Sequence, residues 1–173
     1  MKLGEVWVSA VLYLALGLIL ITIVLAAGIP LINKIRDRNT VAQTKDILFV
    51  LDKNIRTVAS EGTGSKRYVS PVNIDAGELV FDSDQDRLSW SMTTSNKLAE
   101  PSLTLQEGVL FLRLDETPIS DEYKVNLWLD YLNLYDLFMV SDFSNPFSGT
   151  YSLSIENNGT YANGRPTIVL RVA

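Results

Sequence analysis

The sequence predicts an α+β protein, in which a long N-terminal hydrophobic α-helix precedes an antiparallel β-sandwich or barrel-like head domain. Three observations support this. Residues 6–32 carry no charged side chain, residues 41–58 repeat apolar side chains at helical spacing, and the chain after Gly64 alternates apolar and polar residues in short runs. These patterns are typical of a membrane helix, an amphipathic helix and half-buried strands. We therefore expect one helix over residues 5–62 and a β-rich head over residues 65–173.

Composition limits the size of the core and excludes several chemistries. The 173 residues suffice for one ordinary core with one appended element. A net charge of −5 lacks the basic surface that nucleic-acid backbones require, so we expect no direct nucleic-acid partner. The chain has no cysteine and no histidine, which removes thiolate nucleophiles, disulfides, imidazole bases and the commonest zinc ligands. We expect no cofactor, no bound metal and no enzymatic activity.

The first half of the helix, residues 5–32, is expected to be the membrane part. Residues 6–32 exceed the roughly 20 residues that an α-helix needs to cross a bilayer core. A helix is favoured over a strand because, in lipid, the backbone N–H and C=O groups of a single segment can form hydrogen bonds only within that segment. Two other interpretations are a cleaved signal peptide, with small residues at Ala26-Ala27-Gly28, and a helix buried in a soluble core. A head of this size would cover only one face of such a helix.

The second half of the helix, residues 33–62, is expected to pack on the head. An apolar stripe repeats at alternating spacings of three and four residues and ends before Gly62, which can adopt a left-handed backbone. Pro30 lacks an N–H and is expected either to create a hinge over residues 26–30 or to be an ordinary membrane-helix proline. The residues expected to contact the head are Val41, Leu48, Leu51, Ile55 and Val58, with Thr44 in the same stripe.

The head is expected to contain about seven short strands, because alternating runs are separated by turn-forming residues. The expected strands are residues 68–74, 79–81, 88–92, 110–114, 123–129, 151–155 and 168–172. Residues 128–140 are apolar at both odd and even positions. We interpret them as a fully covered central strand with a bend, and the alternative is an exposed contact between subunits.

Only one stretch resembles a metal site. Alternating aspartates at residues 82–86 are typical of the start of a calcium loop. Arg87 occupies the position where such a loop needs glycine, and Thr93 the position of its bidentate glutamate. We therefore expect a hairpin turn here.

The N-terminal residues Met1-Lys2-Leu3-Gly4-Glu5, followed by the apolar run, resemble the start of archaeal type IV pilins. The resemblance covers roughly the first third of the chain. It implies a leader of residues 1–4, with Lys2, Gly4 and Glu5 at the processing site, that a prepilin peptidase removes. It also implies that the helix first lies in the membrane and is then packed into a filament core. The residues implied in core packing are Ala10, Leu14, Gly17, Leu18, Ile21, Leu25 and Pro30. Ser9 departs from the bacterial pattern, which has glutamate there, and Glu5 is a charged first mature residue.

The resemblance implies a structural subunit of an extracellular, cell-surface filament. Its partners would be further copies of itself, the membrane before assembly, and the pilus assembly machinery. The alternatives are a monomeric, single-span anchored domain for binding or envelope structure, and an accessory pilin. Basic residues Lys34, Arg36 and Arg38 follow the apolar segment, and the positive-inside rule alone would leave the head in the cytoplasm. The pattern Asn158-Gly159-Thr160 is a glycosylation acceptor and favours an outside location.

Overall fold

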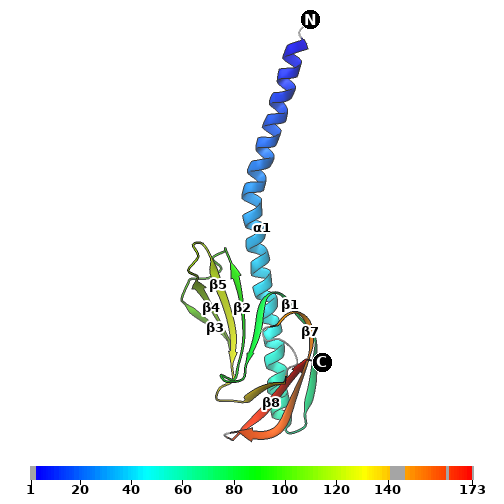
Figure 1. The fold of residues 1–173 in the computed structure, drawn as a ribbon, viewed down its shortest axis with the longest axis vertical. Coiled ribbons are helices and arrows are strands. Elements are labelled where there is room, and N and C mark those ends of the chain that lie inside the picture. The colour runs from blue at the N-terminus through cyan, green and yellow to red at the C-terminus, as the bar shows by residue number, and fades with distance from the viewer. Residues whose placement is uncertain (1–2, 141–146, 163, 173) are drawn as a thin grey trace. The chain divides into compact units, whose positions relative to one another are not determined.

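The computed structural model describes residues 3–140, 147–162 and 164–172. The chain divides into two compact units, Met1–Asp37 and Arg38–Ala173. The first contains the N-terminal part of helix α1, drawn in dark to light blue in Figure 1. The second contains the rest of α1 and the sheet. One N-terminal helix followed by a mostly antiparallel sheet confirms the α+β prediction at this level.

Helix α1 runs from Leu3 to Glu61. It continues through Pro30, so the expected hinge at residues 26–30 does not interrupt the helix. Gly62, with φ +92°, ends it, as the sequence predicted. A positive φ suits glycine because it has no Cβ to clash with the preceding turn.

The described residues of the second unit form eight strands in one sheet, in the order β3-β4-β5-β2-β1-β7-β8-β6. All neighbouring strands are antiparallel except β6 and β8, which are parallel. The strands are β1 Lys66–Asp82, β2 Arg87–Thr94, β3 Thr104–Glu107, β4 Leu110–Glu116, β5 Tyr123–Asp130, β6 Asp136–Val140, β7 Phe147–Ala162 and β8 Arg165–Val172.

The strand prediction needs three corrections. The runs expected at residues 68–74 and 79–81 form one strand, β1, with a register shift between Ile74 and Leu79. Strand β3 was missed because all four of its residues are exposed, so no alternation marks it. Strand β7 extends well beyond residues 151–155.

Residues 128–140 do not form a covered central strand, so that interpretation was wrong. They end β5, turn at Tyr131, and form β6 at the edge of the sheet. In β6, Leu137 is buried and Phe138 is 54% exposed. Apolar residues occupy both odd and even positions of this segment because some of them pack in the core and others lie at the surface.

Gly77 lets β1 pass close to β2. It has φ +77°, and a Cβ there would lie 2.5 Å from the carbonyl oxygen of Ser91 and 2.8 Å from the Trp90 ring. The Trp90 indole in turn donates a hydrogen bond to the carbonyl of Ala76, at 3.0 Å. Because Trp90 is fully buried, its N–H needs this partner.

The β1–β2 turn confirms the hairpin predicted for residues 82–86. Phe81 pairs with Leu88 and Asp82 with Arg87 across it. The Asp82 carboxylate accepts hydrogen bonds at 3.0 Å from the backbone N–H groups of Asp84 and Gln85, as turn aspartates commonly do. Buried Asp86 accepts one from the backbone N–H of Leu137 in β6, at 2.8 Å.

The core lies where the C-terminal half of α1 meets the sheet. Leu48, Leu51, Ile55 and Val58 have no exposed surface, and Val41 packs against them while partly buried. In Figure 1 this cyan part of the helix lies among the strands of the second unit. Inward side chains of the strands complete the cluster, among them Trp90, Leu127, Ile155 and Ile168.

Candidate functional site

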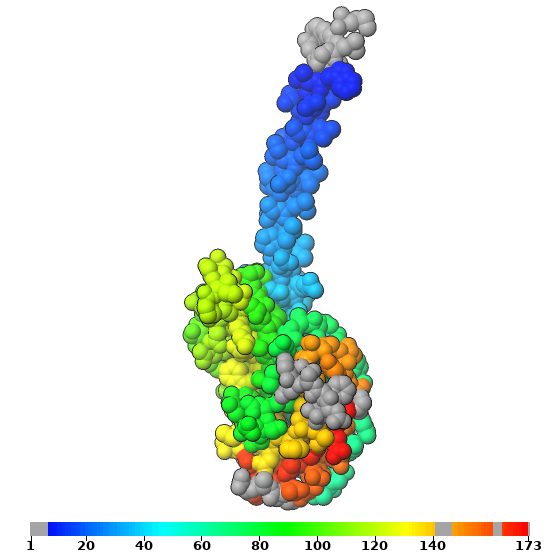
Figure 2. All heavy atoms as spheres, viewed as in Figure 1, coloured from blue at the N-terminus to red at the C-terminus, as the bar shows by residue number. Residues whose placement is uncertain are grey.

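The most unusual surface of the molecule is the apolar surface of α1 in its N-terminal part, which we call the apolar rod (residues 7–32). The large apolar side chains of the rod are between 53% and 75% exposed. The rod appears as the blue column of Figure 2. Folded soluble domains rarely expose contiguous apolar patches beyond a few hundred Å². By length and composition, a surface of this kind is suited to contact with lipid or with other apolar protein.

The rod is apolar around its whole circumference. Val11, Leu12, Tyr13 and Leu14 are consecutive and all exposed, and successive helical residues point about 100° apart. The Thr22 hydroxyl donates to the carbonyl of Leu18, at 2.8 Å, so this polar group is satisfied without water. Among the described residues there is one helix that is long enough and apolar enough to cross a membrane, and it is α1.

The residues implied in filament packing all lie on this rod. They are Ala10, Leu14, Gly17, Leu18, Ile21, Leu25 and Pro30, and none of them is buried in the single chain. Nothing lies within 4 Å of a Cβ placed on Gly17, so a neighbouring helix could approach the backbone there.

The residues implied in leader processing are described only in part. Lys2 lies outside the described residues. Gly4 and Glu5 belong to the first turns of α1.

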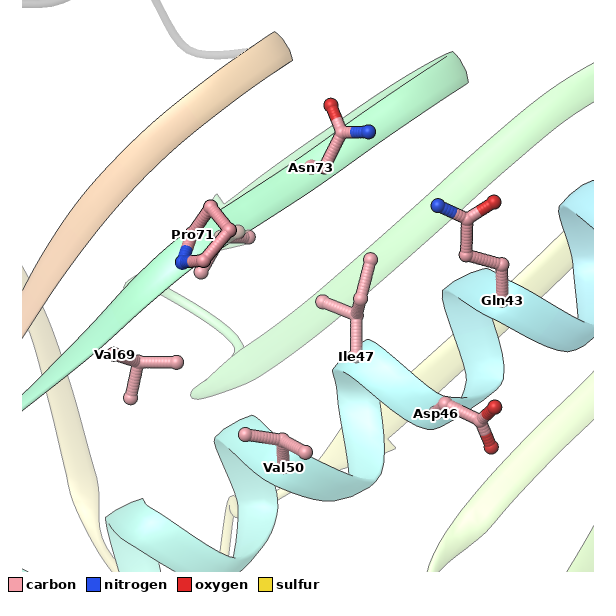
Figure 3. A pocket seen from close by; sticks show the side chains of 8 residues that line it. Gln43, Asp46, Ile47, Val50, Val69, Pro71 and Asn73 are labelled. Atoms are coloured by element: carbon pink, nitrogen blue, oxygen red, sulfur yellow. The ribbon is translucent and has the colours of Figure 1, made fainter.

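A cleft of about 330 Å³ opens between α1 and β1 in the second unit. Figure 3 shows Ile47 of the helix pointing toward β1, where Val69 and Pro71 lie opposite. Among the described residues that line it, Asp46 alone is titratable, so these residues do not bring together the two carboxylates that acid–base chemistry uses. Within residues 3–140, 147–162 and 164–172, no group of three histidine, cysteine or carboxylate side chains could hold a metal ion.

A buried polar network, which we call the Asp52 network, joins α1 to the turn after β5. Tyr131 donates its hydroxyl proton to Asp52 Oδ1, at 2.9 Å. Arg56, one helical turn further on, donates from Nε to both carboxylate oxygens at 2.8 and 2.9 Å. Sequence reasoning missed this network. The i, i+4 spacing of Asp52 and Arg56 signals the ion pair, but nothing local pairs Asp52 with Tyr131.

The Asp52 network makes stability depend on pH. Burial first, and then the neighbouring Asp52 carboxylate, raises the pKa of Tyr131 above its ordinary value of 10.0. The folded state therefore favours the neutral phenol. This contribution is complete below pH 10 and is lost as the pH rises further, because the unfolded chain then ionises more readily.

We expect the free energy of unfolding to fall above pH 10 by about 1.4 kcal/mol per pH unit more steeply than in a Tyr131→Phe variant. Urea unfolding of the detergent-solubilised chain between pH 8 and 11.5, followed by near-UV circular dichroism, measures this. The variant will be less stable at pH 8, by ~1–3 kcal/mol, because Asp52 loses a donor. Equal slopes for the two proteins would contradict the assignment.

The candidate glycosylation site lies beside the end of α1. Asn158 is exposed in β7, and its amide lies 3.5 Å from the Thr160 hydroxyl. Its buried neighbour Asn157 donates to the carbonyl of Val58 and accepts from the N–H of Gly159. The acceptor pattern therefore lies at a register shift in β7, where the Asn158 side chain is accessible.

Taken together, the described residues provide an exposed apolar surface in the first unit and, in the second unit, a sheet packed on the C-terminal part of α1. Comparisons with protein-family models, with curated proteins and with solved structures gave no match to this chain.

Proposed function

We propose that this protein is a structural subunit of an extracellular filament of the type IV pilus kind. The apolar rods would bundle in the filament core, and the heads would form the outer surface as sandwich-like or barrel-like domains. The observation that carries this proposal is the exposure of the rod on every side. It leaves no face of the rod adapted to water, so each face needs a lipid or protein neighbour.

The same surface suits both stages of a filament subunit. Before assembly the rod lies in the membrane, where acyl chains surround it. During assembly it exchanges those neighbours for other rods at little cost, because lipid tails and leucine side chains are about equally apolar. Small residues such as Ala10 and Gly17 then allow close approach of the helices.

Leader removal is part of the proposal. A prepilin peptidase would cut after Gly4, so that the mature chain begins at Glu5. The intact mass of the chain purified from membranes tests this directly. A mass that still includes residues 1–4 would favour the rival function, a monomeric domain that stays anchored by one span.

The decisive experiment is negative-stain electron microscopy of material sheared from cells that produce the protein. We expect filaments that contain this chain as the main component. A chain that remains in the membrane fraction and forms no polymer would contradict the proposal. Filaments in which it is a minor component would identify an accessory subunit.

A single substitution separates filament packing from anchoring. Gly17→Leu is expected to abolish or shorten filaments and to leave the protein in the membrane fraction. The added side chain blocks close approach of helices but is fully compatible with lipid. Leu16→Met, a neighbouring change that conserves volume, serves as the control and should polymerise normally. Normal filaments from the Gly17→Leu chain would show that Gly17 is not at a helix contact.

A further inference from the structure

The outer face of the sheet carries a trough across β1, β2, β5 and β4, with a volume of about 460 Å³. Its floor is formed by the short side chains of Ser89 and Ser91 on β2. In register with them on β5 stand the longer side chains of Trp128 and Asn126. The trough exists because small residues on one strand lie beside large residues on the next. Its volume falls within the roughly 300–1,000 Å³ of small-molecule sites.

One wall of the trough is formed by the aromatic ring of Trp128. Trp128 pairs with Ser89 on one side and with Phe111 of β4 on the other. The Trp128 and Phe111 rings are stacked, with centroids 5.4 Å apart and planes 13° from parallel. Trp128 lines the trough and Phe111 does not, so the indole face that Phe111 leaves uncovered borders the trough. A rigid ring face exposed in this way is a stacking platform for a flat ligand with C–H groups.

Polar groups around the platform are positioned in advance. Arg113 Nε donates to Asp115 Oδ1 at 2.6 Å, and Asn126 Nδ2 donates to Asp115 Oδ2 at 2.9 Å. Across the trough, Arg87 donates to Asp130, at 3.0 Å, while its buried Nε has no partner among the residues that the structure describes. These groups lose little conformational entropy when a ligand binds, because they are already ordered.

Several groups of the trough retain free hydrogen-bonding capacity. The hydroxyls of Ser89 and Ser91 and the ammonium group of Lys124 make no hydrogen bond to any residue in the described part of the chain. A hydroxyl both donates and accepts, so the floor matches a ligand that does the same.

Charges of both signs line the trough and nearly cancel, which decides the class of ligand. The lining holds the cations Arg87, Arg113 and Lys124 and the carboxylates Asp82 and Asp115. Beside the lining, Asp130 forms an ion pair with Arg87, and exposed Glu78 is in register with Ser91. A face with so little net charge does not attract a phosphate, a nucleic acid or an acidic polymer over a neutral molecule. A ring platform, fixed donors and acceptors, and a small net charge suit a neutral sugar, which presents C–H faces and hydroxyl edges.

We propose that this trough binds a neutral oligosaccharide, with Trp128 stacking on one sugar ring and the serine floor and the Asp115 cluster bonding its hydroxyls. This activity goes beyond filament formation and does not depend on it. It assigns a binding role to a sheet face that faces away from the core.

The proposal is tested by isothermal titration calorimetry on the full chain in a zwitterionic detergent, because glycoside detergents would compete for the site. The probes are cellohexaose, maltohexaose, chitohexaose and mannohexaose, with hexagalacturonate as the charged comparison. We expect at least one neutral probe to bind and the charged probe to bind at least tenfold more weakly.

Two variants alter the trough in different ways. Trp128→Ala removes the platform, and Ser91→Tyr fills the floor while keeping the Trp128–Phe111 stack. Each should weaken binding at least tenfold, and Trp128→Phe should weaken it less. Gln106→Ala, on the exposed strand β3 outside the trough, is the control and should bind normally. Circular dichroism confirms that each variant is folded.

Three results would overturn the proposal. The first is that no neutral probe binds. The second is that binding is unchanged in both Trp128→Ala and Ser91→Tyr. The third is that the face joins two copies of the chain, seen as self-association in sedimentation that Trp128→Ala abolishes and no probe competes with.

Discussion

A chain that begins at Arg38 and ends at Ala173 is expected to be soluble and monomeric without detergent, whereas the full chain requires detergent. Residues 38–173 form a compact unit that includes the buried stripe of α1. The apolar rod lies entirely in the other unit. Removing residues 1–37 therefore takes away the surface that needs apolar neighbours and leaves the core intact.

The size of this effect follows from the exposed apolar area. A large aliphatic side chain gains roughly 1.5–3 kcal/mol when it leaves water, so the rod as a whole accounts for tens of kcal/mol. Ultracentrifugation after detergent removal measures the outcome. The full chain should sediment with membranes, micelles or polymer, and the shortened chain should remain in the supernatant as one monomeric species with a cooperative thermal transition.

Two outcomes would contradict this prediction. A full chain that stays monomeric in water would mean that the rod has no need of apolar neighbours, which would also remove the basis of the filament proposal. A shortened chain that aggregates would mean that the second unit has another exposed apolar surface of similar size.

The second large effect is expected at the interface between α1 and the sheet. Leu51→Ala should lower the free energy of unfolding by about 2–5 kcal/mol, because Leu51 is fully buried and its truncation leaves a cavity. Domains of this size are stable by only about 5–15 kcal/mol, so the head would be close to unfolding at physiological temperature.

The preceding residue provides a matched control. Val50 is 47% exposed and lies on the next face of the same helical turn. Val50→Ala should change the free energy of unfolding by no more than about 0.5 kcal/mol. Urea unfolding of both variants, measured in the shortened chain, gives the comparison. Equal losses for the two variants would mean that the stripe does not pack as the structure has it.

Local patterns predicted the helix and most of the sheet. The run of residues 6–32 is recognised by its length without a charge, and the stripe from Val41 to Val58 by its helical period, and neighbouring residues alone create both signals. The hairpin at residues 82–86 was predictable for the same reason, because Asp82 bonds to backbone groups two and three residues away. The exposed strand β3 left no such signal, since its four residues have no buried face.

The sequence by itself determined that this chain has an apolar rod, an amphipathic continuation and a β-rich remainder. A long uncharged run identifies the first, and apolar spacings of two to four residues identify the other two. Tertiary structure alone decided which distant groups meet. Asp52 accepts a hydrogen bond from Tyr131, 79 residues away, and Asn157 donates one to the carbonyl of Val58, 99 residues away. The trough beside Trp128 likewise depends on strand register, which brings Ser89 and Phe111 to either side of one ring. The physical reason is that periodicity records which face of an element is buried, whereas pairing depends on the geometry of the whole sheet and on the turns that set its register.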